Sequence, residues 1–394
     1  MSVAVSAQHF VQIANVVTSP GLLEIEAREA SRPRSKHLYP VVVDTTHPTS
    51  YSGKLSFDIP GSCGPVSFSI DRSETYLEGT VTVSGRMGSK DSCYCSEGAI
   101  VLTKSGRLTY AEFLVDTVAY EMWSIGSEGL VSEIDSDFMN SFGCGNEEES
   151  TEDDGPGIAA GLSGRSEATC EARILFTYND KAAADYSVNE IRARALNGVE
   201  LFNRSSVNSQ IKDEVGLSVA GIEPYSFAAR PLEIITDTDR LANQPAIQAL
   251  RDQHFADVVA LLTGERYATS TGRVASTIPG DNTAYAIVSL PTAGIYTTPH
   301  ELGHLFGGQH THNGNPNAPL HAHAHDFKYG IWPCRKRRKT LISNTSNYRS
   351  IFNFSNPNVS HHGNPTGVAD EYDNAAYMFD NGCPVSTYRV EDGR

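Results

Sequence analysis

Long apolar runs are missing from this chain of 394 residues. No stretch of about 18 consecutive apolar residues occurs, so the sequence predicts no membrane span. Net positive charge is missing too, because the formal charge is −16 at pH 7. Nucleic-acid phosphates would repel so acidic a chain, which argues against a nucleic-acid-binding function. The balance of 39% hydrophobic and 20% charged residues is typical of a globular protein, and the length suits two domains.

The first residues, MSVAVSAQHF, lack the basic start and long apolar centre of a secretory signal peptide. Three interpretations stay open: a signal peptide was removed, export uses another route, or the protein stays inside the cell. The cysteine count is odd, which in an oxidising compartment leaves one unpaired thiol. The alternative is that all are buried and reduced. The seven cysteines are Cys63, Cys93, Cys95, Cys144, Cys170, Cys334 and Cys383.

The first 140 residues are rich in Val, Ser, Thr, Gly and Tyr, and short alternating runs are separated by turn residues. This pattern predicts an all-β sandwich or small barrel built from hairpins, without a catalytic constellation. The runs cover 54–59, 66–70, 79–85, 98–103 and 108–115.

A polar stretch follows, with six acidic residues within 147–154. Its composition predicts a flexible, protease-sensitive linker, although a solvated acidic loop would look the same. We therefore expect a β-rich domain over 1–144, a linker over 145–169 and a second domain over 170–394.

The second domain alternates between strand and helix patterns. Expected strands cover 170–180, 216–227, 258–265 and 282–290, and expected helices cover 187–206 and 245–258. Such alternation predicts a mixed sheet of mainly parallel strands.

A cluster of histidines follows the last of these strands, in the sequence HELGHLFGGQH. His300 and His304 are four residues apart, so on a helix beginning near Gly294 or Thr297 they share one face and can bind one metal ion. Gly307 lets the chain leave the helix, so that His310 can return as a third nitrogen ligand. Three protein ligands leave one coordination position open, as in a catalytic zinc site.

This stretch resembles the zinc motif of the metzincin metallopeptidases, HExxHxxGxxH. The resemblance is strongest to a bacterial subgroup, the peptidyl-Asp metalloendopeptidases, through residues 173–183, 250–264 and 352–367. It covers about 170–385, while residues 1–140 are more loosely similar to the subgroup's propeptide.

The resemblance implies an α+β two-domain protein. An all-β N-terminal domain would precede a metzincin-like catalytic domain, which has a twisted, mixed, mainly parallel sheet and two long helices, the second carrying the zinc motif. The family's activity implies a secreted zinc endopeptidase with one catalytic Zn²⁺, which cleaves protein or peptide substrates. Glu301 would act as general base on a zinc-activated water.

The β-rich domain, 1–144, would then be an inhibitory propeptide that docks on the catalytic domain in cis, making the chain a zymogen. Two alternatives stay open. The chain could be a toxin or effector protease that is injected into another cell without a signal peptide. It could also be an inactive binding protein on a metzincin scaffold, although intact His300, Glu301, His304 and His310 argue against that.

The methionine turn of the metzincins is altered. Alignment on the 352–367 segment places this turn at 340–344, with Ile342 at the methionine position. Either Ile342 forms an apolar platform instead, or Met378 takes that role. A tyrosine that aids catalysis in some relatives would fall near Asn344, so that aid is not expected here.

Cys144-Gly145 stands at the end of the propeptide-like region. In several metzincin groups such a cysteine fills the open zinc position as a thiolate, a "cysteine switch", and thiolate is a good zinc ligand. Cys63-Gly64 offers the same dipeptide within the β-rich part. Within the catalytic domain, Cys334 and Cys383 are candidates for a disulfide.

A basic run lies just before the expected turn. One interpretation is a solvated loop or processing site. Another is a cleft lining that prefers acidic substrate side chains, as the subgroup's specificity would imply, and a third is docking of the acidic linker in cis. The candidate substrate-binding residues in this run are Arg335, Lys336, Arg337 and Arg338.

Overall fold

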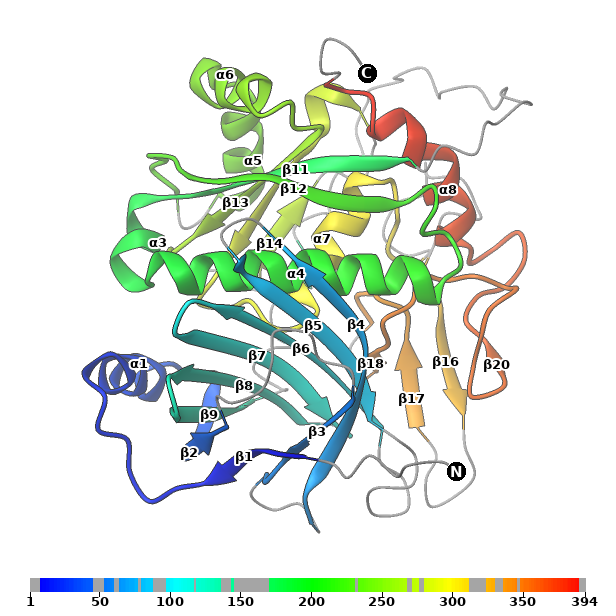
Figure 1. The fold of residues 1–394 in the computed structure, drawn as a ribbon. Helices are drawn as coiled ribbons and strands as arrows, with labels where there is room; N and C mark the ends of the chain where they lie inside the picture. Colours follow the sequence, from blue (N-terminus) through cyan, green and yellow to red (C-terminus); the bar gives the residue numbers. More distant parts are fainter. Residues whose placement is uncertain are drawn as a thin grey trace. The chain divides into compact units, whose positions relative to one another are not determined.

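The structure, a computed structural model, divides into two compact units (Figure 1). The first unit consists of Met1–Ser141 and Ser187–Glu200, and the second of Phe142–Tyr186 and Leu201–Arg394. Helix α4 (Val188–Asn208) thus contributes its first part to one unit and its last turns to the other. The described residues are 8–44, 53–59, 64–76, 79–87, 97–116, 118–135, 143–144, 170–230, 233–267, 271–275, 280–311, 324–329, 336–345 and 348–389.

A closed β-barrel dominates the first unit. Its strand order is β1-β2-β9-β8-β7-β6-β5-β4-β3, with antiparallel neighbours except for the parallel pair β1 and β3. The strands are β1 (Gln8–Ile13), β2 (Ser35–Val43), β3 (Gly53–Phe57), β4 (Val66–Thr75), β5 (Val81–Met87), β6 (Gly98–Ser105), β7 (Leu108–Val115), β8 (Val118–Ile125) and β9 (Glu128–Ile134).

Tight hairpins and an aromatic interior account for this barrel. Strands β6 and β7 are joined by two residues, the first of which is Gly106 with φ 59°. Gly126, with φ 65°, begins the equivalent turn between β8 and β9. These are the turns that match the twist of a hairpin. Inside, Phe57 lies 5.5 Å from Phe68 and 5.2 Å from Phe113 between ring centroids.

The first unit also contains a helix, which the prediction of an all-β region did not include. Helix α1 (Pro20–Ala30) begins with proline in its first turn, where no backbone N–H is needed. Its buried residues Leu22 and Ile25 pack with Tyr110 and Trp123 from the barrel. The apolar residues of α1 are few and lie among polar residues, so the sequence pattern did not reveal this helix.

The second unit contains a twisted, mainly parallel sheet, as the strand and helix patterns predicted. Its order is β10-β14-β15-β13-β11-β12, and β14 is the strand that runs antiparallel to its neighbour β15. The strands are β10 (Gly143–Cys144), β11 (Glu171–Tyr178), β12 (Gly216–Pro224), β13 (Val258–Thr263), β14 (Thr271–Ala275) and β15 (Tyr285–Ser289). Every residue of β13 is buried, as expected for a central parallel strand.

Helices connect these strands, and the C-terminal third adds two small sheets. The helices are α3 (Asp180–Asp185), α5 (Ile234–Ala242), α6 (Pro245–Gln253), α7 (Thr297–Leu305) and α8 (Asn374–Val385). The small sheets consist of β16 (Asp326–Tyr329), β17 (Lys336–Lys339) and β18 (Arg349–Ser350), and of β19 (Ser360–His361) with β20 (Asn364–Pro365). None of the helices in the described part of the chain is long and apolar enough to cross a membrane.

Two expectations need correction. The helix with the zinc motif was expected to be long, but α7 has only nine residues, whereas α4 has 21. The expected Cys334–Cys383 disulfide is also wrong, since Cys383 is bonded to Cys170. The chain brings the start of β11 against α8, with a Cα–Cα distance of 4.8 Å, within the range that a disulfide spans. Cys334 and the predicted linker, 145–169, lie outside the described residues.

Candidate metal centre

Helix α7 carries the first two histidines of the motif. It begins at Thr297, at one of the two predicted starts, and Pro299 lies in its first turn, where proline is tolerated. The Thr297 hydroxyl accepts a hydrogen bond from Gly294 N–H at 2.8 Å. Tyr296 is the N-cap residue of α7, so Thr298 lies inside the helix and not at the capping position.

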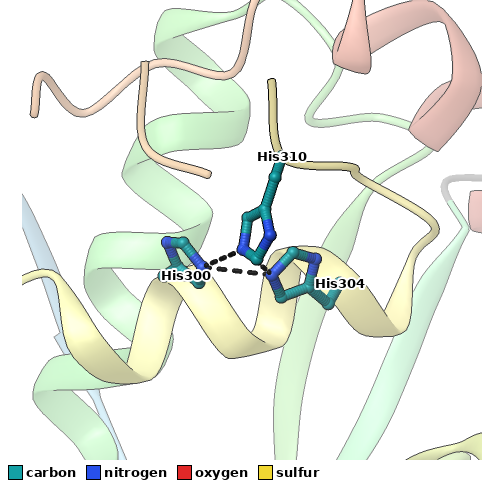
Figure 2. Close-up of side chains that lie close together, drawn as sticks. All are labelled: His300, His304 and His310. Carbon is teal, nitrogen blue, oxygen red and sulfur yellow. Dashed lines mark hydrogen bonds between the residues drawn. The ribbon is translucent and has the colours of Figure 1, made fainter. Parts of the chain in front are cut away.

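The three histidines converge on one point (Figure 2). Their Nε2 atoms are separated by 3.0 Å between His300 and His304, 3.1 Å between His304 and His310, and 3.2 Å between His300 and His310. Each residue is at most 3% exposed. Three imidazole nitrogens at such distances form a group that could hold one metal ion.

Backbone carbonyls orient two of these rings. His300 Nδ1 lies 2.9 Å from Leu341 O, and His304 Nδ1 lies 2.6 Å from Gly308 O. A carbonyl only accepts, so each Nδ1 must donate, and the neutral ring then presents an Nε2 lone pair. The two Nε2 atoms lie 3.0 Å apart, so their lone pairs repel each other, and a shared divalent cation would remove that repulsion. The donor set therefore fits zinc, which favours neutral imidazole nitrogen.

Glycines shape the return of the chain to His310. Gly307 has φ 91°, a conformation that favours glycine, and its N–H donates to His304 O at 2.8 Å. A Cβ at Gly308 would overlap the Ile342 side chain. Helix α7 is short for this reason: it must end directly after His304 so that His310 can fold back.

An apolar floor lies beneath the histidines. Ile342 is fully buried, and a Cβ on Gly303 would meet its Cδ1 at 2.7 Å. Met378 of α8 is also fully buried, and its sulfur would lie 3.3 Å from a Cβ on Gly308. The structure thus places both candidates for the methionine role next to Gly308.

Glu301 is fully buried beside the first histidine. Its Oε1 atom lies 3.8 Å from His300 Nε2. A carboxylate held there is close enough to the histidine cluster to exchange a proton with a water molecule that reacts at the cluster.

Strand β10 brings Cys144 onto the main sheet. The register pairs Gly143 with Thr271 and Cys144 with Arg273, in parallel. Strand β10 therefore occupies the outer side of β14, where the sheet order ends. The alternative cysteine, Cys63, lies outside the described residues.

The basic run becomes strand β17, and its residues have different surroundings. Arg338 is 3% exposed, whereas Arg337 is exposed and its guanidinium lies 5.9 Å from the Tyr348 ring centroid. Lys336 is half-buried, and Arg335 lies outside the described residues. The run therefore offers one buried cation and not a uniformly charged surface.

Arg349 of β18 is the register partner of Arg338. Burial, and then the positive charge of Arg349, lower the pKa of Arg338 to about 10. Arg338 still remains charged at neutral pH. Strand β18 is bonded to the start of α7, because Ser350 O accepts from the Tyr296 hydroxyl at 2.7 Å, and Leu341 O, two residues after β17, accepts from His300.

Three supporting residues were missed by sequence reasoning. The Tyr296 ring packs against the Phe352 ring, with centroids 4.9 Å apart and planes inclined by 32°. Asn374 accepts from Gln309 N–H at 2.8 Å and donates to Gln309 O at 3.2 Å, which holds the segment before His310. Arg349 stands outside the basic run. No local pattern marks any of them, because each acts through a residue distant in sequence.

Comparisons with known proteins agree with the motif. Residues 196–311 match the family described as "Metallo-peptidase family M12B Reprolysin-like". A peptidyl-Asp metalloendopeptidase of Stenotrophomonas maltophilia is 26% identical over 310 residues, covering 74% of this chain and 70% of that protein. Another from Xanthomonas campestris pv. campestris is 28% identical over 244 residues, covering 60% of this chain and 55% of that protein.

Among solved structures, metalloproteinase-II from Bacteroides fragilis superposes with a TM-score of 0.41 at 9% identity, over 74% of this chain and 85% of that chain. A likeness this low supports no argument about fold or function.

Proposed function

We propose that this chain is a metzincin-like metallopeptidase, a zinc-dependent endopeptidase whose metal is held by His300, His304 and His310. The observation that carries the proposal is the convergence of three buried Nε2 atoms within 3.2 Å of one another, two of them oriented by backbone carbonyls. Such orientation is what distinguishes a metal site from histidines that happen to be neighbours.

The chain's own residues supply the acid–base chemistry in this proposal. Zinc bound at the three histidines would supply Lewis acidity, which makes water a better nucleophile and a peptide carbonyl a better electrophile. The Glu301 carboxylate accepts a proton from the attacking water and later donates it to the leaving amine nitrogen. Leu341 O and Gly308 O keep the His300 and His304 rings in one tautomer throughout.

Replacement of the base tests this assignment. Glu301→Gln should keep the fold and bind one zinc per chain, but lose roughly 10²–10⁴-fold in peptide cleavage. The measurement is zinc content by mass spectrometry together with peptide turnover, after the chain has been cut within 145–169. A chelator should abolish wild-type turnover, and added zinc should restore it.

The matched control is Glu171→Gln, which removes an exposed carboxylate from β11 and should leave turnover unchanged. Peptide cleavage that persists undiminished in Glu301→Gln would show that Glu301 is not the base. Absence of peptide turnover in the wild-type chain would instead revive the alternative of a non-peptidase binding protein.

We propose further that the chain is made as a zymogen, in which the region 1–144 inhibits the enzyme. The parallel pairing of β10 with β14 supports this. Extended peptides bind to proteins by adding a strand to a sheet edge, and β10 takes that place on β14. In this proposal Cys144 supplies a thiolate to the metal, and the comparison of Cys144→Ala with Cys63→Ala described below tests it.

We also propose an acidic substrate preference, which the buried cation of β17 supports. Arg338 pairs in register with Arg349 of β18, whose next residue, Ser350, accepts from the Tyr296 hydroxyl at the start of α7, and Leu341, two residues after β17, accepts from His300. A guanidinium pair pairs well with a substrate carboxylate. The related enzymes named peptidyl-Asp metalloendopeptidases lend support, and peptide cleavage profiles of Arg338→Ala test the assignment.

The Cys170–Cys383 disulfide supports export, because such bonds persist in oxidising compartments. We therefore place the enzyme outside the cytoplasm. Thiol alkylation of the protein isolated from its source should leave these two cysteines unmodified, and modification of both would contradict export.

A further inference from the structure

A stripe of polar side chains runs along the first part of helix α4. Its members are four, three and three residues apart, so they lie on one face of the helix. Each is at most 6% exposed, although all are polar or charged. The stripe consists of Glu190, Arg194, Asn197 and Glu200.

The barrel faces this stripe with polar side chains from its outer surface. On β7, Ala111 and Phe113 point into the barrel core, so the alternating residues Tyr110 and Glu112 point outward. The same alternation on the neighbouring strands presents further polar groups to the helix. These are Ser84 of β5, Thr103 of β6 and Glu121 of β8.

Glu190 and Arg194, two of the three charged residues of the stripe, form ion pairs within this unit. Glu190 accepts from Arg28 of α1 at 2.6 Å and 2.9 Å, and from Trp123 Nε1 at 3.1 Å. Arg194 donates to Glu121 Oε2 at 3.0 Å, and its guanidinium lies 4.7 Å from the Tyr110 ring centroid.

The other two residues complete the network. Asn197 accepts from Thr103 Oγ1 at 2.6 Å and donates to Glu112 Oε2 at 3.3 Å. Glu200 accepts from Ser84 Oγ at 2.6 Å and from Arg72 Nε at 2.9 Å. Every member of the stripe is therefore hydrogen-bonded to the barrel or to α1.

Such a surface is unlike the interior of a permanent domain. Permanent contacts are mostly apolar, and buried ion pairs add little net stability because their desolvation is costly. Ala193 is the α4 residue within the apolar cluster on this side of the barrel. If the helix and barrel separated, water could hydrate each member of the stripe, and the helix would expose no large apolar patch.

The barrel residues that face α4 also have partners other than α4. Glu121 also accepts two hydrogen bonds from Arg34, at 2.8 Å and 2.9 Å, so its carboxylate has a second charged partner besides Arg194. Leu22, Ile25 and Leu130 remain packed with one another around Trp123. The contacts that would be lost are thus mainly polar and can be replaced by water.

We propose that the stripe on α4 is a docking surface for the barrel, from which the barrel detaches as a folded module once the chain is cut between 145 and 169. The inference rests on the proposed zymogen function. It adds that the barrel stays bound to α4 after the cut. The polar contacts hold the two together until dilution, or water competing for the same polar groups, dissociates them. The barrel then behaves as a separate, reversible ligand of the helix.

The test uses the full chain in the Glu301→Gln form, so that no activity is needed, with a site-specific cleavage sequence placed within 150–160. Trp332→Phe leaves Trp123 as the only tryptophan, since the chain has two. After the cut, dilution should shift Trp123 emission to the red, because the indole loses Glu190 and becomes hydrated. Far-UV circular dichroism should not change, since both parts stay folded.

Substitutions in the stripe should weaken the cut complex. Arg194→Ala should raise the dissociation constant roughly 30-fold or more, as loss of one partner from a buried charge pair does. Asn197→Ala should raise it roughly tenfold. The matched control is Asn189→Ala, the same change at an exposed position of the same helix, and it should leave the dissociation constant unaltered.

Two outcomes would overturn the proposal. One is that Trp123 emission shifts only together with loss of the circular dichroism signal, which would make helix and barrel one folding unit. The other is that Asn197→Ala and Asn189→Ala behave alike. Neither readout depends on peptide cleavage, so an inactive enzyme would refute the proposed function without affecting this result.

Discussion

We propose that substrate choice depends on the buried Arg338 of β17 together with its partner Arg349. Arg338→Ala should lower turnover of peptides with an acidic residue beside the cleaved bond by roughly 10-fold to 100-fold, and leave neutral peptides nearly unchanged. The reason is that Arg338 is buried next to Arg349 and stays charged at neutral pH. A peptide-library cleavage profile measures this.

Arg337→Ala is the control, because it removes the same charge one position away, from the exposed face of the strand. Equal losses in the two variants would mean that the general basic field, and not the buried guanidinium, selects the substrate. Unaltered acidic preference in Arg338→Ala would remove Arg338 from the specificity site.

The residues of the site differ in how far sequence could predict them. His300, Glu301, His304 and His310 follow from spacing, because a helical turn and one glycine bring them together locally. Tyr296, Asn374 and Arg349 do not, since their partners are backbone atoms or strands far along the chain. The role of Ile342 stays a prediction, because Met378 also lies against Gly308.

Among the elements, β10 has the most direct bearing on latency. If Cys144 is a metal ligand in the uncut chain, Cys144→Ala should raise its peptide turnover roughly tenfold or more, because an intramolecular ligand competes at high effective concentration. A cobalt-substituted chain offers a second measurement, since the thiolate-to-cobalt absorption band should disappear in the variant. The pairing of Cys144 with Arg273 in β14 motivates the test.

Cys63→Ala is the control for this prediction, because Cys63 precedes a glycine as Cys144 does. Activation by Cys63→Ala instead would transfer the switch to the other cysteine. If neither variant activates the uncut chain and the cobalt band never appears, latency comes from β10 as a strand and not from a thiolate.

Helices and strands whose apolar residues recur at a regular spacing were predictable from the sequence. Elements that form only by pairing with a distant part of the chain were not. Strand β7 was predicted with the bounds observed, Leu108–Val115, because its apolar and polar residues fit a barrel wall. Strand β10 has two residues and exists only through its pairing with β14. The Cys170–Cys383 bond was missed because spacing along the chain says nothing of which cysteines meet in space.

At the scale of the whole molecule, the strong acidity of the chain conceals two local concentrations of cations. One is the Arg338–Arg349 pair in the second unit, and the other surrounds Glu29 and Glu121 in the first. In the first unit Arg34 pairs with both of these carboxylates. Net charge therefore did not reveal where the chain uses positive charge.

The carboxyl group of Glu112 makes the stability of the first unit depend on pH. Burial, and then the charge of Glu121, raise the pKa of Glu112 from 4.5 to about 7, despite opposing effects of Arg194, Asn197 and Arg34. Tyr110 also faces this group, and burial keeps its pKa well above 10.0, so it does not titrate in this range.

The sign follows from proton uptake. Because the folded-state pKa of Glu112 is raised, the folded chain binds more protons than the unfolded chain between 4.5 and about 7. This contribution to stability is fully present below pH 4.5 and is lost as the pH rises through about 7. The free energy of unfolding should therefore decrease from pH 5 to 7, by at most about 1.4 kcal/mol for each pH unit.

Glu112→Gln isolates this effect, because the amide resembles the protonated carboxyl group and cannot titrate. Denaturant unfolding followed by Trp123 emission should give a flatter pH profile for the variant, and at pH 8 the variant should be more stable than the wild type. Since Glu112 contacts Asn197 across the barrel–helix surface, the same substitution should tighten the cut complex at neutral pH. Profiles with equal slopes in the two proteins would assign the pH dependence to another group.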